Sequence, residues 1–113
     1  MHEMSIMDNA LKLALNEAAQ AGAQRVHLIQ LRVGTLSGVV PEALEMAFAA
    51  LTPGTMAQGA ELAIESVAAA FWCPHCQSEF AAQDLGAECP ECHQFSWELK
   101  AGRELELASM EIE

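Results

Sequence analysis

The chain has 113 residues, of which 52% are hydrophobic, enough for one domain or for one domain with a small appended module. Sixteen acidic residues against five basic ones give a formal net charge of −11, which argues against binding to nucleic-acid phosphates and favours basic or metal-cation partners. No apolar run is long enough to span a membrane, and the N-terminus lacks a secretory signal, so we expect a cytoplasmic protein with reduced thiols.

Two helices are predicted in the first half of the chain. Apolar residues recur at helical spacing from about Met4 to Ala21, and Gly22 is suited to end this helix in a left-handed conformation. Pro41 suits the first turn of a second helix, which the sequence "TPGT" ends.

Three segments alternate apolar and polar residues as strands do, and they span residues 25–33, 60–67 and 103–113. In the last segment the alternation changes phase, which predicts a β-bulge near Ala108. A tail so regularly patterned is expected to return to the sheet of the first part. The sequence therefore predicts helices and strands that alternate in the first part of the chain, with the cysteine-rich module inserted before the last strand.

Four cysteines form two C-x2-C pairs, at Cys73, Cys76, Cys89 and Cys92. Two residues between cysteines allow both sulfurs to reach one ion, and two such knuckles complete a tetrahedral S4 site for zinc or iron. Because cysteine sulfurs fill all four coordination positions of the ion, we expect a closed, structural site in a zinc-ribbon-like module. Zinc is favoured over rubredoxin-like iron, although the spacing alone does not separate the two metals.

Other uses of these cysteines are less consistent with the sequence. Two disulfides would fit an exported protein, and nothing in the sequence indicates export. A redox C-x2-C pair normally stands alone at the N-terminus of a helix, whereas here two pairs lie close together.

Four histidines are present, and three of them lie away from the N-terminus. His27 is expected to be an ordinary strand residue. His75 lies inside the first knuckle and His93 directly follows the second, so each could contact a cysteine sulfur, serve as an accessory metal ligand or face solvent.

The fourth histidine, His2, lies beside the N-terminus, with Glu3 next to it. The α-amine of Met1, the backbone nitrogen of His2 and its imidazole can chelate one ion through adjacent five- and six-membered rings. Such a nitrogen-rich, square-planar arrangement suits Ni(II) or Cu(II). A single N-terminal histidine is weak support by itself, and a solvated chain end is the simpler interpretation.

The stretches "MHEMSI", "RVGTLSGVVPEALEMAF" and "CPHC…CPEC", in this order and in a chain of this length, resemble the HypA/HybF family of nickel-incorporation proteins for [NiFe]-hydrogenase maturation. The resemblance implies an α+β fold, with two helices packed on a three-stranded sheet and an inserted zinc-ribbon-like module. The nickel-binding domain would comprise residues 1–70 plus 101–113, and the zinc module residues 71–100. It also implies that His2 is the essential nickel ligand, with Glu3 contributing through its backbone or its side chain.

The same resemblance implies a metallochaperone and not an enzyme. It would take up Ni²⁺, dock with a HypB-type GTPase and hand the ion to the precursor of the hydrogenase large subunit, as a monomer or weak homodimer. Two rival hypotheses are a zinc-ribbon module that recruits a basic protein and a rubredoxin-like electron carrier. No Ser/His/Asp set, phosphate loop or open metal site favours an enzyme.

The sequence departs from the family pattern in two places. Val40 stands where many members have an acidic residue, and Glu42 could substitute for it. Gln77 and His93 stand where family knuckles often have glycine, which relieves strain at positive φ, so we expect slightly different turns.

Overall fold

The computed structural model describes residues 2–81 and 87–113. The chain folds into two compact units. The first unit comprises Met1–Arg32, Val39–Glu65 and Glu106–Glu113, and the second comprises Val33–Gly38 and Ser66–Leu105. The chain therefore passes between the units at several points.

Helix α1 (Glu3–Gln20) lies close to where the sequence predicts the first helix. Gly22 follows it with φ of 78°, as predicted for the residue that ends it. The N–H of Gly22 donates to the carbonyl of Ala19 at 3.0 Å, and the N–H of Ala23 donates to that of Ala18 at 3.0 Å. This pair of bonds is the Schellman motif, which satisfies carbonyls left free at a helix end.

The three predicted strands form one sheet in the order β2-β1-β8, with β2 (Glu61–Val67), β1 (Val26–Gly34) and β8 (Leu105–Ile112). The N–H of Thr35 donates to the carbonyl of Val67 at 2.9 Å, which joins the C-terminal ends of β1 and β2. These two strands are therefore parallel, and α2 (Pro41–Leu51) lies in the crossover connection that parallel strands need. Pro41 begins α2, as the sequence predicts.

Strand β8 returns antiparallel on the other side of β1. The N–H of Gly34 donates to the carbonyl of Glu104 at 2.7 Å, and the N–H of Glu113 donates to that of Arg25 at 2.8 Å. The inference that the patterned tail rejoins the sheet is confirmed.

Side-chain pairs between β1 and β8 bear on the predicted bulge. Arg32 contacts Glu106, and the hydroxyl of Ser109 donates to the amide oxygen of Gln30 at 3.1 Å. These partners are two residues apart on β1 but three residues apart on β8. The backbone bonds at the two ends of this pairing, between Gly34 and Glu104 and between Arg25 and Glu113, are nine residues apart on both strands. Side-chain contacts alone do not fix the register, so the bulge near Ala108 stays a prediction.

Arg32 links all three strands of this sheet. Its Nε lies 2.6 Å from Glu65 on β2, and its Nη1 lies 2.8 Å from Glu106 on β8. These three residues also mark the border of the first unit on their respective strands. One guanidinium thus ties the strands together where the chain passes to the second unit.

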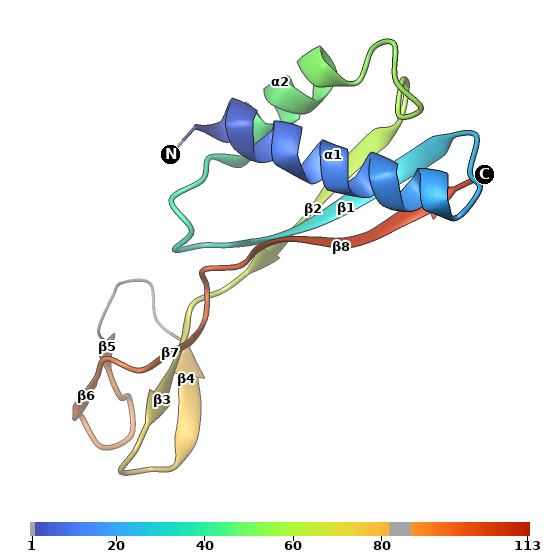
Figure 1. Cartoon of the computed structure of the whole chain (residues 1–113). Helices are drawn as coiled ribbons and strands as arrows, with labels where there is room; N and C mark the ends of the chain where they lie inside the picture. The colour runs from blue at the N-terminus through green and yellow to red at the C-terminus, as the bar shows by residue number, and fades with distance from the viewer. Residues whose placement is uncertain (1, 82–86) are drawn as a thin grey trace. The chain divides into compact units, whose positions relative to one another are not determined.

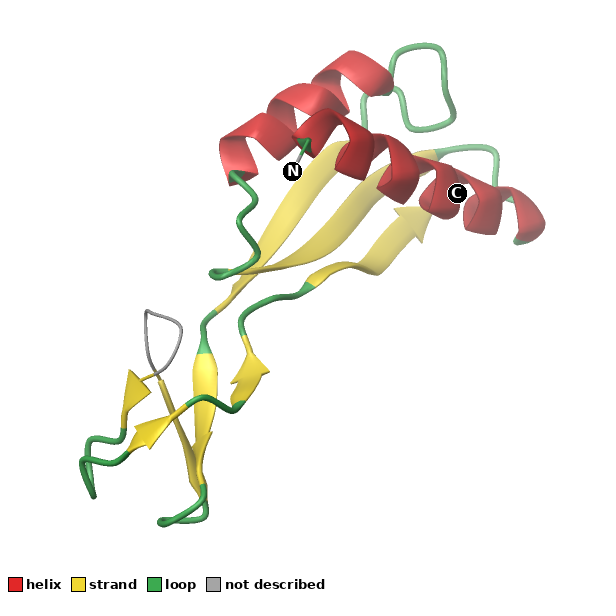
Figure 2. Cartoon of the chain, turned by 60° about the vertical axis from the view of Figure 1, so that its left-hand side comes forward, coloured by secondary structure: helices red, strands yellow, loops and turns green. Residues whose placement is uncertain are grey.

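Both helices cover the same face of the β2-β1-β8 sheet (Figure 1 and Figure 2). Ile29, Leu31 and Val33, predicted to share a buried face, are each 3% exposed or less. The helices complete this core with the buried residues Met7, Leu11, Ala14, Ala18, Leu44, Ala47 and Phe48. In the described residues, no helix has the length and apolarity that a membrane crossing requires.

Short strands build the second unit, and the sequence did not predict them. One sheet pairs β3 (Ala70–Cys73) with β4 (Ser78–Ala81) and β7 (Leu99–Ala101), and a second pairs β5 (Ala87–Glu88) with β6 (Phe95–Ser96). The rings of Phe71 and Phe80 stack with centroids 6.0 Å apart at the core. Leu36, from the loop after β1, packs against this core.

Three backbone segments of the second unit approach closely at Gly34. A Cβ added to Gly34 would lie 2.1 Å from the carbonyl oxygen of Gly102, and one added to Gly102 would lie 2.7 Å from the Cα of Ala69. The N–H of Leu36 also donates to the carbonyl of Gly102 at 2.7 Å. Glycine is required here because backbone occupies the space of a side chain.

Replacing Gly34 with alanine is expected to lower the free energy of unfolding by about 2–3 kcal/mol, because the new methyl group collides with backbone that cannot rotate away. Gly22→Ala is the matched control. It places a methyl group in open space, at a cost of about 1 kcal/mol for its positive φ alone. Urea denaturation followed by circular dichroism measures both. Equal losses at the two positions would contradict the close approach at Gly34.

Candidate metal centres

The four cysteines converge in the second unit. Their Sγ atoms all lie within 4.8 Å of one another, with 3.5 Å between Cys73 and Cys92 and 3.9 Å between Cys76 and Cys89. A tetrahedral ion with metal–sulfur bonds of about 2.3 Å needs sulfurs about 3.8 Å apart. The cluster therefore fits a single four-coordinate ion, as the spacing predicts.

The disulfide interpretation does not fit this geometry. All four cysteines are free thiols, and the 3.5 Å between the sulfurs of Cys73 and Cys92 is far longer than a disulfide bond of about 2.05 Å. The two C-x2-C pairs share one cluster, which favours a metal site over separate redox pairs.

Backbone geometry forms each knuckle. The N–H of Gln77 donates to the carbonyl of Cys73 at 2.8 Å, and the N–H of His93 donates to that of Cys89 at 2.9 Å. Gln77 and His93 have φ of 52° and 64°. The chain therefore adopts the left-handed conformation at both turns with ordinary side chains in place of glycine.

The environment of the thiols differs from one cysteine to the next. The backbone N–H of Cys92, followed by that of Glu91, lowers the pKa of Cys89 to about 7 despite its burial. Burial raises the pKa of Cys76 to about 12, with help from the neighbouring sulfurs. Four thiolates this close repel one another, so a divalent cation is needed to hold them all ionised, and its binding releases protons.

The three histidines away from the N-terminus are exposed. His27, on β1, lies 2.5 Å from Glu113 and behaves as the surface strand residue that the sequence predicts. Nδ1 of His93 lies 3.9 Å from a carboxylate oxygen of Glu88, beside the second knuckle. His75 lies in the turn between Cys73 and Cys76.

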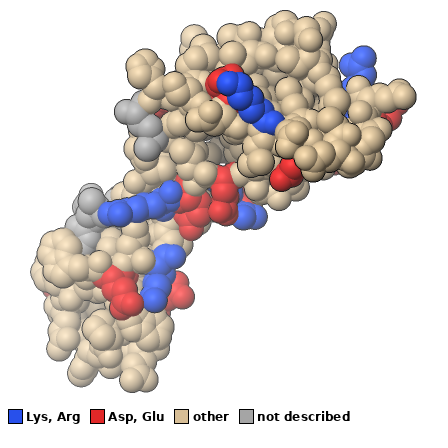
Figure 3. All heavy atoms as spheres, in the orientation of Figure 1, with Lys and Arg blue, Asp and Glu red and all other residues tan. Residues whose placement is uncertain are grey.

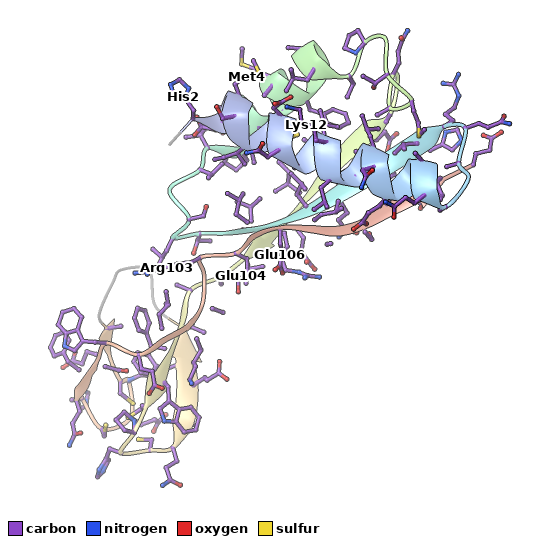
Figure 4. The ribbon with its side chains drawn as sticks, in the orientation of Figure 1. His2, Met4, Lys12, Arg103, Glu104 and Glu106 are labelled. Atoms are coloured by element: carbon purple, nitrogen blue, oxygen red, sulfur yellow. The ribbon has the colours of Figure 1, made fainter. Side chains whose placement is uncertain are left out.

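At the start of the chain, His2 is the N-cap residue of α1, with its carbonyl accepting the N–H of Ile6 at 3.1 Å. Its imidazole makes no capping hydrogen bond and is exposed. Figure 4 shows the ring beyond the first turn of the helix, near Met4. Met1, whose amine is part of the predicted site, lies outside the described residues.

Glu3 makes a contact that the sequence did not reveal. Its Oε2 accepts the backbone N–H of Val40, the N-cap residue of α2, at 3.3 Å. Its own backbone N–H and that of Val40 lower the pKa of the Glu3 carboxyl, so it is ionised at neutral pH. No side-chain pattern could predict this bond, because its donor is a backbone group 37 residues away.

A sequence model of the family described as "Hydrogenase/urease nickel incorporation, metallochaperone, hypA" matches residues 1–112. The chain belongs to the HypA family. Hydrogenase maturation factor HypA of Picosynechococcus sp. is 40% identical over 112 residues, which cover 99% of each chain. The protein of the same name from Chloroflexus aurantiacus is 41% identical and covers 98% of each chain.

Two solution structures of HypA proteins share this fold. The solution structure of the Ni metallochaperone HypA from Helicobacter pylori aligns with a TM-score of 0.68 at 22% identity, covering 99% of this chain and 97% of that one. A second solution structure of HypA protein aligns with a TM-score of 0.73 at 24% identity, covering 99% and 96%.

Three predictions are confirmed by these comparisons. The family resemblance is correct, the α+β fold with its four-cysteine cluster is present, and the family is one of metallochaperones and not of enzymes. Family membership favours a maturation factor over an electron carrier or a free-standing interaction module. The roles of His2, Glu3, His75 and His93, and the division into nickel and zinc domains, stay predictions.

Removing the metal from the cysteine cluster is expected to unfold the second unit and to leave α1 and α2 folded. Two of the five buried residues in the core of the second unit are the ligands Cys73 and Cys89, so that core loses its centre without an ion. Circular dichroism and amide NMR spectra before and after chelation measure this, and metal analysis should find one zinc per chain. A red, iron-containing protein would contradict the zinc prediction.

Cys76→Ser provides the control for chelation, because a chelator should cause no further change in a protein that has already lost the site. Dispersed amide signals from residues 70–81 in the metal-free protein would show that the second unit folds without an ion.

Gln77→Gly is expected to stabilise the metal-loaded second unit by about 1 kcal/mol, because glycine adopts a φ of 52° without the strain of a side chain. Gln77→Ala, which keeps a Cβ, should leave the stability nearly unchanged. The chelator concentration that removes half of the metal ranks the three proteins. Equal values for all three would show that the turn is unstrained.

Proposed function

We propose that the chain binds Ni²⁺ through its N-terminal Met-His-Glu sequence and delivers it for maturation of the [NiFe]-hydrogenase large subunit. One observation carries this proposal: His2 is the N-cap of α1, so its exposed imidazole and its backbone nitrogen stand together at the chain's start. Membership of a nickel-incorporation family supports it.

The chemistry of this chain end suits nickel. The α-amine and the backbone nitrogen of His2 close a five-membered ring around an ion, and that nitrogen and the imidazole close a six-membered ring. Three nitrogens in one plane match the preference of Ni(II) for square-planar sites. Binding displaces protons from these groups, so acidification favours release of the ion.

Glu3 serves this site through its backbone in our proposal. Its carboxylate is engaged with the N–H of Val40 and holds the start of α1 against the start of α2. The fourth position around nickel is then open to the Glu3 backbone or to a group of the receiving protein. Val40 needs no carboxylate for this arrangement, since its contribution is a backbone donor.

In this proposal the two metal centres have different roles: the cysteine cluster retains its metal ion, and the N-terminal site transfers nickel. The cysteine cluster encloses its ion with four protein ligands and is assigned to structural zinc, whereas the N-terminal site is open and can release nickel. His93 and His75, exposed beside the knuckles, are accessory nickel ligands in this scheme. We assign the protein to the cytoplasm, where it acts as a monomer or weak homodimer.

Two partners follow from the proposal, a HypB-type GTPase and the large-subunit precursor. The outer surface of α1 near His2 is the candidate docking surface for the GTPase. On the face seen in Figure 3, charged atoms are few over the helical part of the chain. On α1, Lys12 and Asp8 form an ion pair, with 2.9 Å between Nζ and Oδ2. Met4 and Leu13, about half exposed, add apolar area to this surface.

Nickel titration by calorimetry, on protein with a native and untagged N-terminus, tests the proposal. We expect one nickel per chain in the wild type and no measurable binding by His2→Ala, with the zinc content of both proteins unchanged. Losing the imidazole breaks the six-membered chelate ring, which explains the expected loss.

His27→Ala is the matched control, because it removes an exposed histidine that pairs with Glu113 at the other end of α1. It should bind nickel as the wild type does. Equal binding by wild type and His2→Ala would contradict the proposal and return His2 to an ordinary chain end. Unchanged affinity and coordination in His93→Ala would remove that residue from the scheme.

A further inference from the structure

Two large aromatic side chains are exposed on the second unit. Phe95 is 65% exposed and Trp97 is 76% exposed, yet their rings stack on each other with centroids 6.5 Å apart and planes inclined by 20°. Aromatic residues exposed as a group are typical of interaction surfaces, because their area is costly to leave in water. We call Phe95 and Trp97 the aromatic pair.

The backbone beneath the aromatic pair is firmly held. Ser96, between the two rings, is 4% exposed, and its hydroxyl donates to the carbonyl of Trp72 and accepts the N–H of Glu98 at 3.2 Å. The N–H of Trp72 donates in turn to the carbonyl of Glu98 at 2.9 Å. Phe95 in β6 and Trp97 just after it therefore project from anchored backbone, so a partner would lose little free energy in ordering them.

Charge around the aromatic pair is negative. Glu88 lies opposite Phe95 in the β5–β6 pairing, and Glu98 directly follows Trp97. Residues 87–98 hold three glutamates and no lysine or arginine. The nearest lysine or arginine in sequence, Lys100, contacts Glu98 at 3.2 Å and lies over the ring of Trp72. This pair is neutral, so the negative charge of the segment comes from Glu88 and Glu91.

The negative charge determines which kind of partner is expected to bind the aromatic pair. A second copy would bring the same glutamates face to face, and a nucleic acid would bring its phosphates against them. Lysine and arginine are attracted both to the carboxylates and to the faces of aromatic rings. We propose that the aromatic pair docks a segment of a partner protein in which arginine or lysine alternates with apolar side chains.

This surface lies on the second unit, and the proposal does not depend on nickel binding at the N-terminus. The partner is identified by its chemistry alone. Affinity should depend on both the rings and the surrounding charge, because the proposed segment supplies apolar groups to the rings and cationic groups to the carboxylates.

The test uses full-length, zinc-loaded protein and a synthetic peptide that alternates arginine with leucine. In a Trp72→Phe background, Trp97 is the remaining tryptophan, since the chain has two. We expect the peptide to shift its fluorescence to saturation, and a peptide that alternates glutamate with leucine to have no effect. Calorimetry should show binding at least about tenfold weaker for Phe95→Ser/Trp97→Ser, since aromatic side chains are frequent hot spots.

Met46→Ser is the matched control, because Met46 is an apolar residue 75% exposed on α2, in the first unit. It should bind the peptide as the wild type does. Equal affinity for all three proteins would show general attraction to an acidic chain and overturn the proposal. Self-association that disappears with the aromatic pair in sedimentation experiments would also overturn it, in favour of a second copy. If the double variant loses zinc, Trp97→Gln replaces it with the same expected direction.

Discussion

The central position of β1 is the constraint on which the rest of the fold depends. It pairs with parallel β2 on one side and with antiparallel β8 on the other, so segments from three distant parts of the chain meet on it. The parallel pair requires a crossover, which supplies α2 to cover the sheet beside α1. The chain leaves the sheet at the end of β2 and re-enters it at the start of β8, at the same end of the sheet. The residues between these strands form an excursion, by which we mean an inserted segment joined to the sheet at both of its ends. The cysteine cluster lies in that excursion.

The cysteine cluster and the proposed nickel site use different parts of the backbone. The cysteine knuckles are turns whose N–H groups already donate to carbonyls, as at Gln77 and His93, which leaves the sulfurs in fixed places. At the start of a helix, by contrast with the knuckles, the first backbone N–H groups have no hydrogen-bond acceptors within the helix. Glu3 uses its carboxylate to satisfy one such donor at the start of α2, on Val40. The negative charge of the chain as a whole favours the approach of cations to either centre.

The parts of this structure that the sequence could predict are those with a local or periodic signal. Gly22 at a helix end, the alternation in β1 and β8 and the spacing of the cysteines each have one, because local geometry selects the residue type. The strands β5 and β6 have two residues each, too few to show a period, and they were not predicted. The packing of Leu36 against the second unit and the bond from Val40 to Glu3 also escaped prediction. Both join residues that only the folded chain brings together, and a single sequence carries no record of such contacts.

The closed excursion has a consequence for how this chain can vary in evolution. Adjacent strands lie about 4.8 Å apart, so β2 and β8, which flank β1, are about 10 Å apart where one leaves the sheet and the other returns. A loop of about four residues spans that distance. The strands β3 to β7 are not part of the β2-β1-β8 sheet, so the cysteine-bearing segment occupies the place of a short loop that crosses the end of β1. Loops of this kind accept inserted domains readily, so the excursion can lengthen, shorten or be exchanged while the helices and their sheet keep the same architecture.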